Sequence, residues 1–282
     1  MNLYIGCSGW SYDGWKGIFY PKELENRKWL SHYSKFFKFV EVDSTFYSIP
    51  SSFMVKGWKD KTPDDFRFAL KFPKAITHDN GLQDVSKYLY PFFYALEPLV
   101  DKITCLLIQL PPYFSKEKGF YSFRDLVPKL DKRYRYALEV RESTWFDKEV
   151  IDFLRKNNIS LVWSVRDELK TPSIVTSDHV YIRFIGDRSI NERDFGKTVK
   201  DRKKEMLEYI DNMRKIQNDS NVQDISIAFN NHFAGFGPQS VNDFLRLMDK
   251  PEIRWNKDLR YSSNKSTKQT NISDFTFFTK PS

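Results

Sequence analysis

Four short apolar segments of the chain end in charged or amide side chains that could bind a ligand or transfer a proton. They cover residues 39–43, 66–71, 107–109 and 136–141. Side chains two apart in a strand point to the same face, so Glu41 and Asp43 share one direction. Glu139 and Arg141 share a direction for the same reason. A charge at the end of an apolar strand is unfavourable unless it is paired or used. Several such strands in succession predict the rim of a barrel, where strand ends carry the chemistry.

Lys71 and Glu139 are the candidate catalytic residues. A lysine at a barrel mouth can be a base, a Schiff-base nucleophile or an anion clamp. A carboxylate beside it can be a general acid or base. The alternative is a structural ion pair of Lys71 with Glu139 or Glu41. Arg166 follows the sixth expected strand and could equally pair with its sequence neighbours Asp167 or Glu168.

Ten side chains at or just after the expected strand ends are candidate substrate-binding groups. They are Ser8, Trp10, Glu41, Asp43, Tyr47, Gln109, Arg141, Arg183, Asn230 and Asn231. A guanidinium can grip a carboxylate or phosphate at two points. The aromatic rings could wall a pocket for a sugar, although core packing explains them almost as well. Asparagine also favours turns, so the amides have a structural alternative as well.

The histidines do not suit a three-histidine zinc site. Of the four, only His78 and His232 follow expected strands, while His32 falls in an expected helix and His179 at a strand start. A Mg or Mn site formed by Glu41, Asp43 and Glu139 stays open as an alternative. No phosphate-cradling glycine loop and no Gly-x-Ser-x-Gly elbow occur. We therefore expect no metal and no cofactor, and metal-independent proton transfer by Lys71 or Glu139.

Strands and helices that alternate along the chain would position these side chains. The expected strands cover 3–7, 39–43, 66–72, 104–110, 136–141, 159–165, 180–185 and 225–229. Eight strands separated by helices predict an α/β fold, a single-domain (β/α)8 TIM-like barrel. An open doubly wound sheet is disfavoured because no Gly-x-Gly-x-x-Gly turn follows the first strand. Ser51 or Ser52 is expected to cap a helix, and the connection after the sixth strand is too short for a full one.

Composition sets the broad limits. The 282 residues are 40% hydrophobic and 17% aromatic, which suits one large globular α/β domain. We expect the barrel over 1–255 and a polar tail over 256–282 that packs on it. No apolar run reaches the roughly 20 residues that span a bilayer, and no secretory signal opens the chain. With two cysteines, both in apolar runs, we expect a reduced, cytoplasmic protein. The net charge of +8 favours anionic partners.

A series of short motifs resembles the DUF72 (YecE-like) family. In order they cover residues 6–12, 15–21, 41–50, 68–73, 76–78, 107–112, 137–141, 181–184 and 229–231, with Trp145. The resemblance implies a TIM-like barrel and supplies no reaction, because the family is defined without one. Two positions depart from its usual pattern. Asp43 stands where an Asn is usual, and Ile185-Gly186 replaces the usual His-Gly, so a mechanism that relies on that histidine does not carry over.

Three classes of function fit these residues. The first is an enzyme, a metal-independent lyase or isomerase, that acts on a small anionic or polar metabolite. The second is a nucleic-acid-processing enzyme, suggested by the basic charge and the many aromatics. The third is a non-catalytic barrel that binds a ligand at its mouth. No membrane partner is expected.

Overall fold

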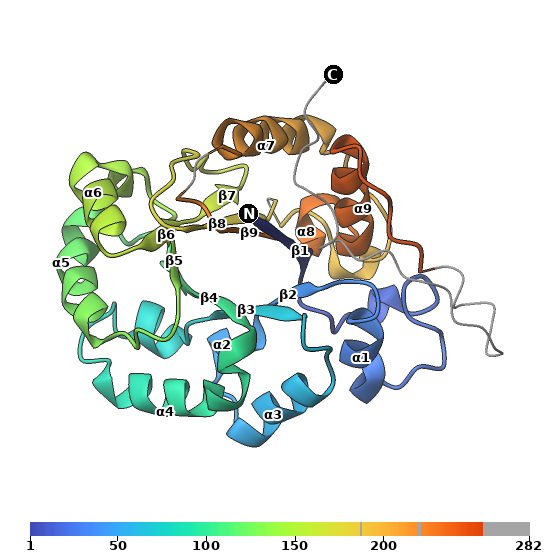
Figure 1. The fold of residues 1–282 in the computed structure, drawn as a ribbon, viewed down its shortest axis with the longest axis horizontal. Coiled ribbons are helices and arrows are strands. Elements are labelled where there is room, and N and C mark those ends of the chain that lie inside the picture. Colours follow the sequence, from blue (N-terminus) through green and yellow to red (C-terminus); the bar gives the residue numbers. More distant parts are fainter. Residues whose placement is uncertain (187, 219–220, 256–282) are drawn as a thin grey trace.

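Parallel strands surrounded by helices form the fold (Figure 1). The structure is a computed structural model, and it describes residues 1–186, 188–218 and 221–255. The strands are β1 Asn2–Ser8, β2 Phe39–Val42, β3 Arg67–Lys71, β4 Ile103–Gln109, β5 Tyr136–Glu139, β6 Ile159–Leu161, β7 Trp163–Val165, β8 His179–Phe184 and β9 Asp224–Phe229. The main helices are α1 Trp29–Tyr33, α2 Ser44–Tyr47, α3 Ser52–Asp60, α4 Ser86–Leu96, α5 Lys116–Leu126, α6 Lys148–Lys156, α7 Lys203–Ile216, α8 Asn231–Ala234 and α9 Gly237–Leu247.

The nine strands make one nearly closed barrel. Their order is β6-β5-β4-β3-β2-β1-β9-β8-β7, and every pairing is parallel. The two ends of this order, β6 and β7, are halves of the single run expected over 159–165. The first half pairs with β5 and the second with β8, with Val162 between them. The eight expected runs are therefore all present, and the predicted TIM-like barrel is confirmed.

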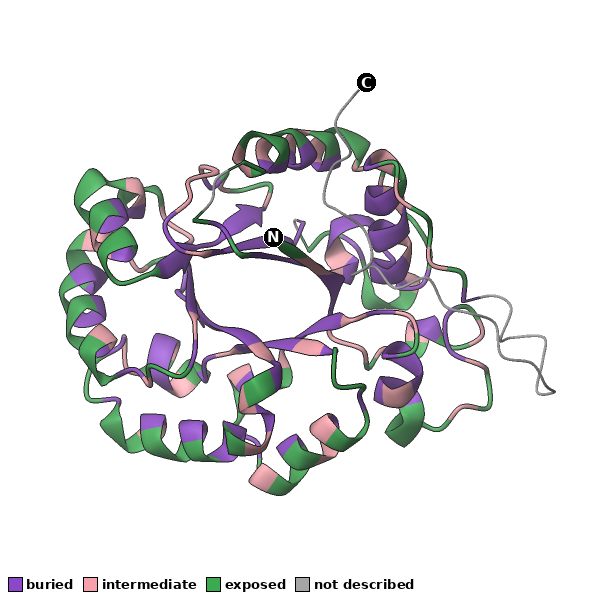
Figure 2. Cartoon of the chain, viewed as in Figure 1, coloured by how far each residue is buried: buried purple, intermediate pink, exposed green. Residues whose placement is uncertain are grey.

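Strand alternation sorts side chains into the barrel interior and the layer under the helices. Eight buried side chains form the apolar filling of the barrel: Phe39, Ala69, Cys105, Leu107, Ala137, Val162, Tyr181 and Ala228. Their sequence neighbours point outward into a larger core against the helices, whose outer faces are exposed (Figure 2). Residues two positions beyond the filling, towards the strand ends, therefore face the barrel mouth.

Polar side chains also lie at the opposite, N-terminal end of the barrel. Arg135, just before β5, donates to Asp224, to Asp178 at 3.2 Å and to Gln223 at 3.0 Å. Asn2 Nδ2 also donates to Asp224, at 2.7 Å. Because these charges are paired, the protein avoids the free-energy cost of burying each charge alone. These ion pairs and hydrogen bonds thus stabilise the N-terminal end of the barrel, and we look for a ligand site at the C-terminal end.

Local signals in the sequence explain several boundaries. Ser51 Oγ accepts the Met54 N–H at 3.2 Å and caps α3, as predicted. Pro91 lies inside α4. In residues 166–178, between β7 and β8, the structure has no helix, in agreement with the short connection expected there. The expected tail over 256–282 lies outside the described residues. Within the described part of the chain, no helix is long and apolar enough to cross a membrane.

Candidate functional site

The C-terminal ends of the strands bring most of the candidate residues to one end of the barrel. Glu41, Lys71, Gln109, Glu139 and Arg183 each lie two positions beyond a residue of the apolar filling, on five different strands. Alternation therefore turns all five side chains inward, above that filling. The apolar strand cores that bury them also remove them from water, so each charge needs a partner.

Arg183 is the centre of a buried ion cluster. Its Nε and Nη2 donate to the two carboxylate oxygens of Glu41, both at 2.6 Å. Its Nη1 donates to Glu139 on the far side. Tyr181 lies two residues before Arg183, on the same face of β8, and its hydroxyl donates to Glu41. The exposed fraction of Arg183 is 1%, and that of Glu41 and Glu139 is 0%. A bidentate pair with a second carboxylate leaves this arginine little capacity for a ligand.

The charges in this cluster are held in their ionised forms. Burial alone would raise the pKa of Glu139, but the cations of Arg183, Arg141 and Lys71 lower it to about 2. The same balance lowers the pKa of Glu41, where burial is outweighed by Arg183 and Lys71. Burial would lower the pKa of Arg183, yet Glu139 and Glu41 raise it well above its usual value. At neutral pH the cluster therefore consists of two ionised carboxylates, Glu41 and Glu139, that are both hydrogen-bonded to the guanidinium of Arg183.

Lys71 pairs with a different carboxylate, nearer to solvent. Its Nζ lies 2.5 Å from Oδ1 of Asp43, the carboxylate one position beyond β2. The side chains are 13% and 30% exposed, so the pair lies at the rim and not in the buried cluster. An ammonium and a carboxylate in contact can exchange a proton with a bound molecule. The negative charge at position 43 thus has a cationic partner.

Arg141 and Arg166 are cations that their protein partners satisfy only in part. Arg141 Nε donates to Glu139 Oε1 at 3.1 Å, and its two terminal nitrogens donate to no described residue. Arg166 Nη2 lies 3.0 Å from Glu168, whereas its Nη1 is buried and has no partner in the described chain. Burial lowers the pKa of Arg141 most, and the like charges of Arg166 and Arg183 lower it further. The charge of Arg166 is therefore near enough to act on Arg141, and each guanidinium has donors to spare.

Neutral polar groups at the mouth also lack partners. Ser8 Oγ, at the end of β1, and Gln109 Oε1, at the end of β4, are buried without a hydrogen bond to any residue that the structure describes. Ser164 Oγ on β7 is in the same state. An unpaired buried donor or acceptor costs about 1–3 kcal/mol, so such groups are expected to have a partner in the working protein.

The remaining predicted site residues are spread around the rim. Trp10 is half-buried, with its ring edge-on to Trp58 at 6.1 Å between centroids. Tyr47 is 73% exposed at the end of α2. Asn230 lies at the mouth and caps α8, accepting the His232 N–H at 2.9 Å.

Asn231, by contrast, lies behind the barrel wall. Its Oδ1 accepts from Trp15 Nε1 at 3.2 Å and from the Gly237 N–H at 2.9 Å. Two consecutive residues at a strand end face opposite ways, so only one of the two asparagines reaches the mouth.

The histidines hold structural positions. His179 contacts Ser226 Oγ at 2.9 Å inside the barrel, and burial lowers its pKa to about 4. His78 lies near the mouth in the turn after β3, where burial, then Arg141, lowers its pKa. No group of three or more His, Cys, Asp or Glu in the described residues could hold a metal ion. Each carboxylate of the Glu41, Asp43 and Glu139 set instead faces a cationic side chain.

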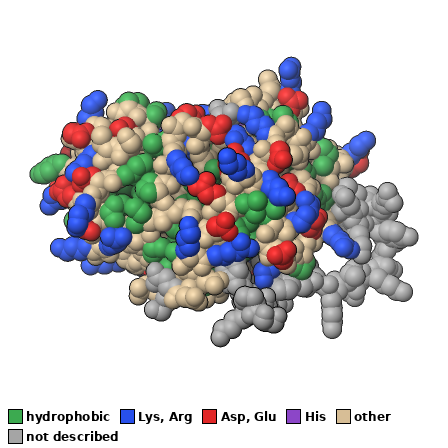
Figure 3. Space-filling view, turned by 90° about the horizontal axis from the view of Figure 1, so that it is seen from above, with side chains coloured by type: hydrophobic (Ala, Val, Ile, Leu, Met, Phe, Trp, Pro, Cys, Tyr) green, Lys and Arg blue, Asp and Glu red, His purple; other side chains and the backbone are tan. Residues whose placement is uncertain are grey.

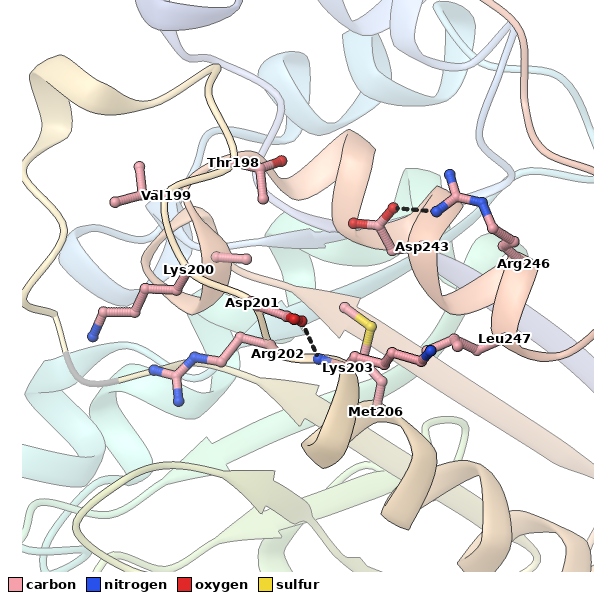
Figure 4. A pocket seen from close by; sticks show the side chains of 11 residues that line it. Thr198, Val199, Lys200, Asp201, Arg202, Lys203, Met206, Asp243, Arg246 and Leu247 are labelled. Atoms are coloured by element: carbon pink, nitrogen blue, oxygen red, sulfur yellow. Dashed lines mark hydrogen bonds and ion pairs between the residues drawn. The ribbon is translucent and has the colours of Figure 1, made fainter.

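A separate cavity of about 370 Å³ lies outside the barrel, between the start of α7 and α9 (Figure 4). Its floor is Met206, Ala234 and Leu247, and charged side chains surround the opening. These charges are largely matched within the protein. Arg202 donates to Asp167 and Glu205, and Arg246 binds Asp243 and Glu252. Among the described residues, the partly buried guanidiniums Arg141 and Arg166 have donors to spare at the barrel mouth, which we therefore take as the candidate site.

Two contributors to the site were missed or underweighted in the sequence. Tyr181 shares a strand face with Arg183, so alternation could have placed it in the barrel interior, where it donates to Glu41. Arg166 was a weaker candidate that could equally have paired with Asp167 or Glu168. It does lie beside Glu168, but Asp167 pairs with Arg202, and a free guanidinium nitrogen remains.

Known proteins resemble the chain in sequence. It is 30% identical to the UPF0759 protein YecE of Escherichia coli (strain K12) over 148 residues, which are 52% of this chain and 51% of YecE. That match therefore spans about half of the relative's length. It is 24% identical to the UPF0759 protein YunF of Bacillus subtilis (strain 168) over 274 residues, covering 88% of this chain and 95% of YunF.

Solved structures of the same kind resemble it in fold. A DUF72 family protein from Thermotoga maritima MSB8 superposes with a TM-score of 0.73 at 26% identity, covering 89% of this chain and 100% of that one. A DUF72 family protein from Enterococcus faecalis V583 gives a TM-score of 0.69 at 18% identity, over 89% and 98% of the two chains. The sequence profile of DUF72, described as a protein of unknown function, matches residues 4–262. The chain therefore belongs to the DUF72 family.

Proposed function

We propose that the barrel mouth binds a small anionic, polar metabolite, and that the Lys71–Asp43 pair is its proton-transfer group. The observation that carries the proposal is that two guanidiniums at the C-terminal strand ends, Arg141 and Arg166, have terminal nitrogens that are not all matched by carboxylates of the described chain. Like charges held together in a partly buried place are unfavourable without an anion between them. A carboxylate or phosphate would satisfy both with charge-assisted hydrogen bonds.

Proton transfer is assigned to Lys71 and not to Glu139. Both oxygens of Glu139 already accept hydrogen bonds from arginines, and a carboxylate with a pKa of about 2 is a weak base at neutral pH. Its chemistry suits an anchor that holds Arg141 and Arg183 in place. Lys71 is partly exposed at the rim, where a bound molecule can reach its side chain beside Asp43. Such chemistry would suit a lyase or isomerase that needs no metal.

A small ligand is preferred to nucleic acid, and one side of the barrel lacks the basic patch that a nucleic acid would need. Figure 3 shows one side of the molecule, on which basic and acidic side chains are interspersed and not gathered into a single basic patch. A duplex needs a row of phosphate contacts across a wide face. The candidate cations instead cluster at the strand ends, on a scale that suits one anionic group.

Thermal unfolding and calorimetry with inorganic phosphate, sulfate and small carboxylates test the binding. A ligand that binds only the folded state raises its melting temperature. We expect Arg141→Met to weaken binding of the best anion at least tenfold, the equivalent of about 1.4 kcal/mol. Arg124→Met, which removes one positive charge on the outer face of α5, is the matched control and should leave the affinity unchanged. Protection that survives Arg141→Met, or protection by no anion at all, would refute the proposal.

A further inference from the structure

We infer that the anion carries a hydroxylated chain, as in a sugar phosphate or a sugar acid, and that the hydroxyls lie on the β9–β1 side of the mouth. The inference rests on the proposed function, since it concerns the rest of the molecule whose anionic group binds Arg141 and Arg166. It follows from how the polar side chains are distributed around the barrel.

Three cations of the mouth lie across the barrel from two neutral polar residues. Lys71 ends β3, Arg141 follows β5 and Arg166 follows β7, and because β6 and β7 nearly close the barrel, the three positions lie on one arc of its rim. The opposite side is formed by the adjacent strands β9 and β1, which end in Asn230 and Ser8. Cys7 pairs with Phe229, so Ser8 and Asn230 come next to one another, one position beyond. An anion held by the cations would extend its other end towards these two residues.

Ser8 and Asn230 offer what a hydroxyl needs. The Ser8 hydroxyl is both a donor and an acceptor, and it is buried with no partner among the described residues. Its carbonyl is occupied by the Tyr12 hydroxyl at 2.5 Å, which holds the strand end in place. Asn230 uses Oδ1 to cap α8, so its amide N–H groups stay available. A ligand hydroxyl can donate to Ser8 and accept from Asn230.

An aromatic ring follows on the same side. Trp10 lies two residues beyond Ser8, past Gly9, whose φ of +83° turns the chain there. Its ring is half-buried and fixed edge-on against Trp58. Such a ring provides apolar surface on which the C–H groups of a sugar chain can pack. Two hydroxyl partners and an aromatic wall opposite a cationic cluster match a polyhydroxylated anion better than an alkyl one.

Matched pairs of probes test this by calorimetry. Glycerol 3-phosphate is compared with propyl phosphate, and gluconate with hexanoate, so that each pair differs in hydroxyls and the two pairs separate phosphate from carboxylate. We expect at least one hydroxylated probe to bind at least tenfold more tightly than its partner. Ser8→Ala should reduce that ratio at least threefold. Because the hydroxyl has no protein partner, the substitution should not unfold the protein.

Tyr134→Phe is the control for Ser8→Ala. It also removes a buried hydroxyl without a partner in the described chain, but just before β5, at the other end of the barrel. It should leave the ratio unchanged. Equal affinities within both pairs, or a ratio that Ser8→Ala leaves intact, would overturn the inference and leave the anion site standing. If none of the four probes bound and phosphate also failed, the proposed function would fall first, and this inference with it.

Discussion

Replacing Arg183 by Met should destabilise the protein strongly, because it leaves two buried carboxylates without their shared cation. Arg183 makes two hydrogen bonds of 2.6 Å to Glu41 and a further one to Glu139, all beyond the reach of solvent. Removing one member of a buried ion pair costs about 3–5 kcal/mol, while Met keeps most of the packing volume. For a domain of this size that corresponds to a fall in melting temperature of roughly 6–20 °C.

Urea unfolding followed by tryptophan fluorescence measures this loss, since the chain has seven tryptophans. In the variant, burial is no longer opposed by Arg183, so the pKa of Glu41 rises and the folded state takes up a proton as the pH falls. The unfavourable charge then disappears. The destabilisation should therefore be smaller at pH 5 than at pH 7.

A double-mutant cycle with Glu41→Gln gives the decisive comparison. In the wild-type background this substitution should destabilise, because it breaks the bidentate pair. In the Arg183→Met background it should stabilise, because it removes a buried charge that has lost its partner. A loss below about 1 kcal/mol for Arg183→Met, or further destabilisation by Glu41→Gln in that background, would refute the ion cluster as the structural basis of the mouth.

Three further predictions concern the stability of the fold. Burial, then Arg135, lowers the pKa of His179 to about 4, so the unfolded chain binds a proton first as the pH falls below about 6.5. The free energy of unfolding should therefore decline from about pH 6.5 to pH 4. Urea titrations should show that this free energy depends less on pH in His179→Gln. Lys102 Nζ donates to the carbonyls of Thr62 at 2.9 Å and Pro63 at 2.8 Å. Lys102→Met should therefore lower the free energy of unfolding by about 1–3 kcal/mol. An unchanged free energy of unfolding would show that these hydrogen bonds do not stabilise the fold. Gly57→Ala should stabilise α3 by about 0.5–1 kcal/mol, because nothing lies within 4 Å of the added methyl group. Gly186→Ala should destabilise the protein by about 1–3 kcal/mol or more, because φ is +77° and the new Cβ would lie 2.3 Å from the His232 carbonyl oxygen. Melting temperatures of the two variants that move in the same direction would refute this contrast.

The fold and the location of the site could be predicted from local patterns. Apolar runs bounded by turn residues mark all eight strand runs, and alternation places Glu41 with Asp43 and Glu139 with Arg141. The same rule separates Asn230 from Asn231, although both were expected to bind substrate. These predictions depend only on residues close together in the sequence, and for that reason they could be made without the structure.

The partners of each charge could not be predicted in this way. Arg183 was expected to face an anionic ligand, and its actual partners come from β2 and β5, more than 40 residues away. Which strand ends meet across a barrel depends on tilt and stagger, which alternation along one strand does not contain. Lys71 could likewise have paired with Glu41 or Glu139, and the register brings it to Asp43 instead. The spare capacity of Arg166 emerges only once these pairs are known.

A crystal structure of the protein soaked in tungstate, a strongly scattering phosphate mimic, would test the anion site most directly. The anomalous signal locates the bound anion without assumptions about the reaction. We expect a peak at the C-terminal mouth, with the oxygens around the tungsten about 3 Å from guanidinium nitrogens of Arg141 and Arg166, the distance of a charge-assisted hydrogen bond. The peak should disappear in Arg141→Met crystals. Tungstate that binds only on the outer surface, with the mouth empty, would contradict the account.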